Sequence, residues 1–166
     1  AYITTDQADN KITGFNPGAM KFPAPFDFST VNPKGSIAIV APGNLEDMTK
    51  CSAAYKSRGI DYIFDPGQSL PMWEKAELVK CIDGSNILIS NDYELELIVS
   101  KTGLDKKELL KRTGAIITTL GEVGSRISAG KFEIEIPAAK PNEVKDPTGA
   151  GDAYRAGLIK GLVQNL

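Results

Sequence analysis

The chain has 166 residues, 42% of them hydrophobic and 24% charged, which is typical of a soluble globular protein. Nineteen basic residues against 21 acidic ones give a net charge of −2, so nothing indicates binding to a nucleic-acid polymer. The chain contains no histidine, which excludes Ser-His-Asp and Cys-His nucleophilic sites and the HExxH zinc site. A catalytic proton acceptor in this chain is therefore expected to be a carboxylate.

The sequence also carries information on where in the cell the protein is expected. Its apolar runs, such as residues 36–42 and 86–90, are of strand length and too short to span a membrane. Residues 1–6 show neither a basic start nor an apolar signal run. Cys51 and Cys81 form no metal or redox spacing and are expected to be reduced thiols. We therefore expect a cytoplasmic protein with no membrane partner.

The first segment, residues 1–21, differs from the rest. Two β-type runs at residues 2–5 and 11–15 flank a turn-forming segment at residues 7–10, and this pattern predicts a hairpin. Two strands alone cannot bury enough apolar surface to be stable. We therefore expect the hairpin to lie over a larger body or to pair with another subunit.

Residues 22–166 alternate between strand and helix patterns and are expected to form one α/β core. The apolar run 36–40 predicts a strand in a sheet that is covered on both faces. The next helix should be capped by Asn44 and should end at Gly59. Further strands are predicted at 62–64, 86–90 and 115–120, and a hairpin at 125–128 and 132–136. The predicted helices are one that contains Trp73, Ala76, Val79 and Ile82, two short ones before residue 115, and a last one from about Ala150. The alternation predicts an α/β fold with a mainly parallel sheet.

The strongest chemical signal is the run DPTGAGDAYRAG at residues 146–157. Its glycines allow a turn that exposes backbone N–H groups and opens directly into a helix. These N–H groups and the positive end of the helix dipole favour an anion. Asp152 would repel an anion, but it suits a base that takes a proton from an alcohol while the N–H groups hold a phosphate. The other interpretation is a glycine-rich helix start with an aspartate in its first turn.

Two better-known phosphate loops do not match. The chain has no GxxxxGK[ST] run, which excludes a P-loop ATPase of that type. A GxGxxG pattern that starts at Gly149 fails at its last glycine, where Tyr154 stands.

Residues 146–157 closely resemble the C-terminal signature of the PfkB/ribokinase family of kinases, D-[TP]-T-G-[AC]-G-D-A-[FY]. The resemblance implies that Asp152 is the catalytic base. It also implies that the backbone of Gly149, Ala150 and Gly151 forms an anion hole.

Two cation sites are implied by the same resemblance. Asp146 and Thr148 match positions that often help to bind a monovalent cation, for which potassium is the candidate. Asn91 and Glu94 match the family's N-x-x-E motif, which organises magnesium and phosphates largely through water. An asparagine at a helix start with a glutamate three residues later is also a capping box, and one residue can serve both roles.

Two further runs fall in family order. The run TLGEVG resembles the family's T-L-G-x-x-G turn, which implies that Thr119, Gly121 and Gly124 bind the nucleotide, although a simple hairpin entrance also fits. Asp65 and Gln68 follow a strand at the end where open α/β sheets bind ligands. We expect them near the phosphate or substrate, and a plain turn after the strand is the alternative.

Three other side chains are candidates for roles in packing or at the site. Tyr154 and Trp73 are expected to serve packing. Arg155 is left open between contact with a phosphate or carboxylate and a solvated or structural ion-paired role. None of the three is assigned to catalysis.

The resemblance implies an enzyme that uses ATP and Mg²⁺ to transfer the γ-phosphoryl group to a hydroxyl of a sugar or nucleoside. Residues 1–21 resemble part of the β lid that closes over the sugar, and pairing of this hairpin would make a homodimer. The chain is most similar to bacterial adenosine-kinase-like members, so adenosine is the first expected acceptor, before ribose and fructose.

The resemblance covers nearly the whole chain, but family members extend further at both ends. Their aspartate that grips the substrate's hydroxyls lies upstream of Ala1, and residues that close the nucleotide pocket follow Leu166. We therefore expect a fragment of a kinase. The second hypothesis is a non-catalytic nucleotide-binding or assembly fragment of such a kinase, and a merely structural α/β domain is the third.

Overall fold

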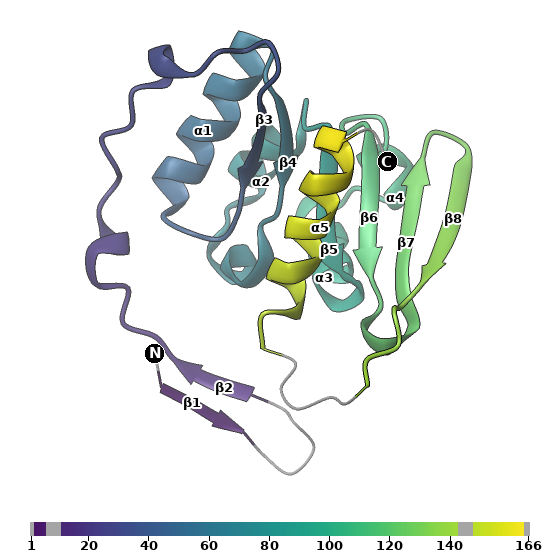
Figure 1. Ribbon diagram of the computed structural model, residues 1–166. Coiled ribbons are helices and arrows are strands. Elements are labelled where there is room, and N and C mark those ends of the chain that lie inside the picture. Colours follow the sequence, from purple (N-terminus) through teal and green to yellow (C-terminus); the bar gives the residue numbers. More distant parts are fainter. Residues whose placement is uncertain (1, 6–10, 143–147, 165–166) are drawn as a thin grey trace.

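The computed structural model describes residues 2–5, 11–142 and 148–164 and contains two separate sheets (Figure 1). A two-stranded antiparallel ribbon is formed by β1 (Tyr2–Thr5) and β2 (Lys11–Gly14). The second sheet has six strands in the order β3-β4-β5-β6-β7-β8. These strands are β3 (Ile37–Val40), β4 (Asp61–Phe64), β5 (Ile87–Asn91), β6 (Ala115–Thr119), β7 (Gly124–Ala129) and β8 (Phe132–Pro137).

The six-stranded sheet is mostly parallel, as the sequence predicts. Strands β3 to β6 pair in parallel, and β7 and β8 add an antiparallel hairpin at one edge. The helices are α1 (Leu45–Arg58), α2 (Lys75–Ile82), α3 (Asp92–Thr102), α4 (Lys106–Leu109) and α5 (Ala150–Gln164). Four 3-10 helices are η1 (Gly18–Lys21), η2 (Phe28–Thr30), η3 (Gly67–Met72) and η4 (Gly121–Val123).

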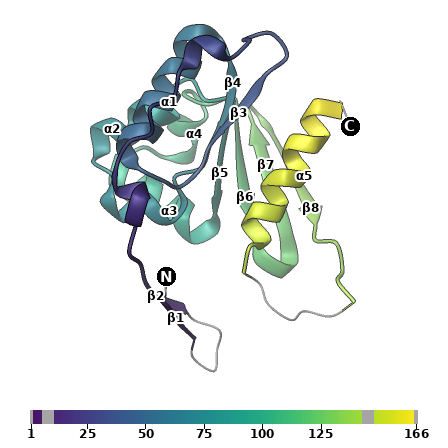
Figure 2. The ribbon, with the colours of Figure 1, turned by 60° about the vertical axis from the view of Figure 1, so that its left-hand side comes forward.

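Helices cover both faces of this sheet (Figure 2). Alternate residues of each central strand point to opposite faces, so Leu88 of β5 packs with α1, α2, α3 and α4 while its neighbour Ile89 packs under α5. On the α5 side, Ile63, Ile89 and Ile117 form the buried cluster. The helix therefore lies directly over the strands that end at the candidate site.

Helix ends follow the local sequence. The Asn44 side chain accepts hydrogen bonds from the backbone N–H groups of Glu46 and Asp47, which caps α1. Gly59 ends α1 in the left-handed region at φ 66°. Both ends match the prediction.

Strand β3 lies at the edge of the sheet, and its residues are half-buried except for Val40, which is buried. The sheet is covered on both faces, as predicted, because Ala38 packs on one face while Ile37 and Ile39 pack under α5. One expectation about the helices was wrong. Trp73 does not lie in the helix with Ala76, Val79 and Ile82, because it is extended at ψ 134° after η3, and α2 starts at Lys75. Trp73 is nevertheless only 2% exposed, which confirms its packing role.

The β1–β2 ribbon stands away from the six-stranded sheet (Figures 1 and 2). Tyr2 and Ile3 are 86% and 53% exposed, so these side chains pack against no larger body in this chain. The following segment runs along α1, where the Asn44 side-chain amide donates to the carbonyls of Met20 and Lys21. In the part of the chain that the structure describes, no helix has both the length and the apolarity needed to cross a membrane.

Candidate active site

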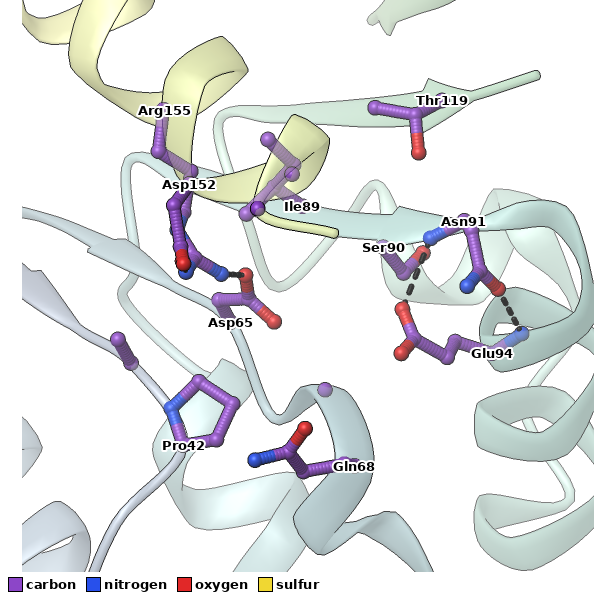
Figure 3. Close-up of a pocket in the computed structure, with 14 residues that line it drawn as sticks. Pro42, Asp65, Gln68, Ile89, Ser90, Asn91, Glu94, Thr119, Asp152 and Arg155 are labelled. Carbon is purple, nitrogen blue, oxygen red and sulfur yellow. Dashed lines mark hydrogen bonds and ion pairs between the residues drawn. The ribbon is translucent and has the colours of Figure 1, made fainter. Parts of the chain in front are cut away.

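The carboxyl ends of the four parallel strands open into one cavity of about 520 Å³ (Figure 3). Ligands bind at this edge in open α/β sheets. The amino end of α5 closes the cavity from the other side. The lining residues are Ala41 and Pro42 after β3, Asp65, Gly67 and Gln68 after β4, Ile89, Ser90, Asn91 and Glu94 at β5 and α3, Thr119 of β6, and Gly149, Gly151, Asp152 and Arg155 at α5.

The amino end of α5 has a backbone geometry that suits anion binding. Gly149 adopts φ 83°, a conformation that favours glycine, and its carbonyl accepts the first helical hydrogen bond, from the N–H of Ala153, at 2.9 Å. The first N–H groups of a helix have no partner inside it. A Cβ atom placed on Gly149 or Gly151 would meet no atom within 4 Å, so a bound group could approach this backbone closely. The geometry suits the anion hole expected at Gly149, Ala150 and Gly151.

Asp152 projects from the first turn of α5 and lines the cavity (Figure 3). Its side chain is 75% exposed. Arg155, one turn further along the same helix, bonds to Asp152 and also to Asp65 at the end of β4. Arg155 is thus ion-paired with two carboxylates, and both of them line the candidate site.

Asp65 differs from Asp152 in its surroundings, because its side chain is only 8% exposed. Burial raises the pKa of Asp65 above its ordinary value, and the neighbouring Glu94 adds to the rise. Arg155 and a hydrogen bond from the backbone N–H of Gly67 oppose it. Asp65 lines the cavity and forms an ion pair with Arg155, and its expected place near the phosphate or substrate stays a prediction.

Asn91 and Glu94 form the capping box of α3. The Glu94 N–H donates to Asn91 Oδ1 at 2.7 Å, and the Asn91 N–H donates to Glu94 Oε2 at 2.9 Å (Figure 3). Both residues also line the cavity, and Glu94 has a second carboxylate oxygen outside the capping box. The structure thus allows both roles that the sequence left open. Carboxylate oxygens suit Mg²⁺, which usually keeps several waters.

Ser90 is a site residue that sequence reasoning missed. It lines the cavity at the end of β5 and is 3% exposed, and its hydroxyl is buried with no partner among the described residues. The available signal was its position, directly before Asn91 at the carboxyl end of a central strand. Gln68, which was predicted, does line the cavity, as does Pro42, which was not.

A second cavity of about 300 Å³ lies beside the first, and Thr119 and Gly151 line both. It brings together the predicted nucleotide residues Thr119, Gly121 and Gly124 with the α5 turn. Its other walls are mainly apolar and include Ile136, Pro137, Ala138, Ala139 and Tyr154. The TLGEVG run is at the same time a hairpin entrance, since it connects β6 to β7.

Gly124 shows why this entrance needs a glycine. It adopts φ 122°, and a Cβ atom there would lie 2.0 Å from the carbonyl oxygen of Ile136. Tyr154 packs on the isoleucine cluster under α5, and its hydroxyl donates to Ser125 Oγ at 2.9 Å, which confirms the expected packing role.

The predicted monovalent-cation site involves Asp146, which lies outside the described residues, and Thr148, which is exposed. Within residues 2–5, 11–142 and 148–164, no three Cys, Asp or Glu side chains converge as a metal-binding group. The two cation assignments remain predictions.

Known proteins and one family model match nearly the whole length of this chain. The family model described as "pfkB family carbohydrate kinase" matches residues 1–166. A nucleoside kinase from Methanocaldococcus jannaschii is 38% identical over 99% of this chain and 53% of its own length. The structure of Burkholderia thailandensis nucleoside kinase in complex with inosine aligns with a TM-score of 0.86 at 38% identity, over 99% of this chain and 54% of that one. The same enzyme in complex with ADP-inosine aligns with a TM-score of 0.83 at 39% identity, over 96% of this chain and 50% of that one. The chain thus spans about half the length of the proteins it matches.

Proposed function

The chain belongs to the pfkB family of carbohydrate kinases, and we propose that the protein carrying it transfers the γ-phosphoryl group of ATP to a hydroxyl of a nucleoside. One observation carries the proposal. Asp152 lines a cavity at the carboxyl edge of the parallel sheet, beside the open N–H groups at the start of α5. A base and an anion site are thus adjacent, as phosphoryl transfer requires.

In this proposal Asp152 accepts the proton of the acceptor hydroxyl. The hydroxyl oxygen forms a bond to the γ-phosphorus as the bond from that phosphorus to the bridging oxygen of ADP breaks. The backbone of Gly149, Ala150 and Gly151 holds the negative charge that develops on the phosphoryl oxygens. The Asp152 side chain is 75% exposed, so its carboxylate can meet a substrate.

The second cavity suits the nucleoside part of ATP. Its apolar walls can accept a base, and Thr119 and Gly151 connect it to the first cavity, where the phosphates would lie. Magnesium, when bound, would neutralise phosphate charge. Glu94 is the residue placed to hold it through water, and Asp146 with Thr148 would hold potassium.

The acceptor is proposed to be a nucleoside, with adenosine first and ribose or fructose behind it. The relatives named above are nucleoside kinases, and one of them was solved with inosine, so inosine belongs beside adenosine among the acceptors to try. Residues 1–21 are proposed to act as part of a lid over the acceptor, and the exposed ribbon is proposed to pair with a second copy, separately from the α/β core of residues 22–166.

The test is ADP release by the complete protein that contains this sequence, with adenosine, inosine, ribose and fructose compared. We expect magnesium-dependent turnover with a nucleoside, and Asp152→Asn should lower kcat by about 10²- to 10⁴-fold. Glu46→Gln removes a first-turn carboxylate from α1 instead and serves as the matched control. ATP binding without phosphorylation of any acceptor would favour a non-catalytic nucleotide-binding module. Full turnover by Asp152→Asn would remove the assigned base.

A further inference from the structure

The guanidinium of Arg155 connects two carboxylates of unequal exposure. Nη1 donates to Asp65 Oδ2, and Nη2 donates to Asp152 Oδ1 (Figure 3). The Arg155 side chain is itself 18% exposed, so both contacts are partly shielded from water. The planar guanidinium presents its donors in a fixed arrangement, which links the position of one carboxylate to that of the other.

Asp65 is the fixed end of this connection. Its backbone N–H donates to the Val40 carbonyl at 2.8 Å, and its carboxylate receives a hydrogen bond from the Gly67 N–H. A buried carboxylate that loses its partner carries a large desolvation penalty. Arg155 therefore cannot leave Asp65 without stranding a buried charge, and from this anchored position it reaches the exposed Asp152.

On the basis of the proposed function, we propose that Arg155, anchored on Asp65, is a positioning residue that holds Asp152 in the orientation needed to meet the acceptor hydroxyl. One oxygen of Asp152, Oδ1, is occupied by the guanidinium. The other, Oδ2, has no hydrogen-bond partner among the described residues and is left for the substrate. A side chain in the first turn of a helix, three-quarters exposed, would otherwise sample several rotamers.

The other role to separate from positioning is that of a ligand of the ATP phosphates. The two carboxylates use two of the five guanidinium N–H donors of Arg155 and pair with its positive charge, which favours the positioning role. The two roles predict different kinetics. Loss of a positioning residue lowers kcat, while loss of a phosphate ligand raises the KM for ATP.

The kinetic test uses Arg155→Gln, Asp65→Asn and the double variant in the complete protein, with Lys160→Gln on the same helix as the control. Arg155→Gln is expected to lower kcat about 10- to 100-fold, the scale of loss from a small misplacement, with both KM values within about twofold of wild type. Asp65→Asn should lower kcat in the same way, and the double variant should be no worse than Arg155→Gln, because both changes break one chain of contacts. Arg155→Lys keeps the positive charge but loses the planar arrangement of donors that contacts both carboxylates. Its kcat should therefore lie between those of wild type and Arg155→Gln.

A second measurement does not depend on activity. In ¹⁵N NMR spectra, a guanidinium held at both ends gives separate Nη resonances for Arg155, and Asp65→Asn should merge them. Merged resonances in the wild-type protein would overturn the inference whatever the activity. Unchanged kcat with a raised KM for ATP in Arg155→Gln would also overturn it and assign Arg155 to phosphate binding. Separate resonances in a protein that phosphorylates no acceptor would keep the held guanidinium and refute the proposed function alone.

Discussion

The two faces of the six-stranded sheet are packed very unequally. Among the described residues, the hydrophobic cluster under α1, α2, α3 and α4 has thirteen buried residues, whereas the hydrophobic cluster under α5 has three, Ile63, Ile89 and Ile117. Helix α5 has no fully buried residue of its own. The side chains proposed for chemistry, Asp152 and Arg155, belong to this loosely packed helix. Stability and chemistry are thus placed on opposite sides of the same strands.

The adjacent residues Leu88 and Ile89 test this comparison most strongly. They are 0% and 3% exposed, and each packs on a different face. Leu88→Ala should lower the free energy of unfolding by about 2–5 kcal/mol and leave kcat of the folded protein unchanged. Ile89→Ala should cost less stability, because its surroundings are less closed, but should lower kcat because α5 rests on it. Urea unfolding and steady-state kinetics measure both. The reverse pattern would show that the α5 face carries the stability.

The capping boxes of α3 and α4 allow the second comparison, with a smaller expected loss of stability. Asn91 and Glu94 cap α3 beside the cavity, and Asp105 and Glu108 cap α4 with the same pattern of hydrogen bonds but do not line the cavity. Asn91→Ala and Asp105→Ala should each lower the free energy of unfolding by about 0.5–2 kcal/mol. Only Asn91→Ala should raise the magnesium concentration needed for half-maximal turnover. An equal effect of both variants on this concentration would limit Asn91 to its capping role.

The hydroxyl of Tyr154 offers a smaller test of how α5 is held. Tyr154→Phe keeps the ring on the isoleucine cluster but removes the hydrogen bond to Ser125, whose side chain is nearly buried. The expected loss in the free energy of unfolding is about 0.5–1.5 kcal/mol. Tyr93→Phe, at a position 71% exposed, is the control and should change stability by less. If both variants match wild type in thermal unfolding, the Ser125 contact does not help to hold α5.

The smallest expected effect concerns Asp65 and pH. Since burial raises the pKa of Asp65 above its ordinary 3.8, the folded protein binds this proton more tightly than the unfolded chain. The stability from protonation is fully present below that ordinary value and is lost as the pH rises through the folded-state pKa. The difference in unfolding free energy between wild type and Asp65→Asn should therefore fall as the pH rises from 3.8 to the folded-state pKa of Asp65, and should then stay constant. A difference that grows with pH would mean that Arg155 outweighs burial.

Much of the fold could be predicted because its signals are local. The strands predicted at 36–40 and 86–90 appear as β3 and β5 within one residue, and the cap at Asn44 forms as expected. Trp73 was wrongly predicted to lie in a helix because it is an apolar residue at helical spacing from those that follow. This spacing does not reveal that η3 precedes Trp73 and that Trp73 itself is extended. The half-buried state of β3 follows from its place in the strand order, which no local pattern contains.

In the candidate site, most of the lining residues could be predicted from the sequence, but the ion pair between Asp65 and Arg155 could not. Asp152, Glu94 and Thr119 stand in runs whose spacing indicates an anion site, a helix start and a turn, and the structure brings them around adjoining cavities. The ion pair between Asp65 and Arg155 joins residues ninety positions apart. It depends on how α5 crosses the sheet, which is set by packing on the isoleucine cluster rather than by any motif.

This separation has a consequence for the order in which the molecule folds. The parallel pairs from β3 to β6 and their helices form over neighbouring stretches of chain, whereas the bond from Arg155 to Asp65 closes a loop of ninety residues and needs both ends already in place. Late contacts of this kind add little to the folding rate and mainly slow unfolding. During synthesis, β3 to β8 would leave the ribosome before α5 could dock, and until then Asp65 would face water without its cation. The ion pair between Arg155 and Asp65 thus reports that α5 has docked on the sheet.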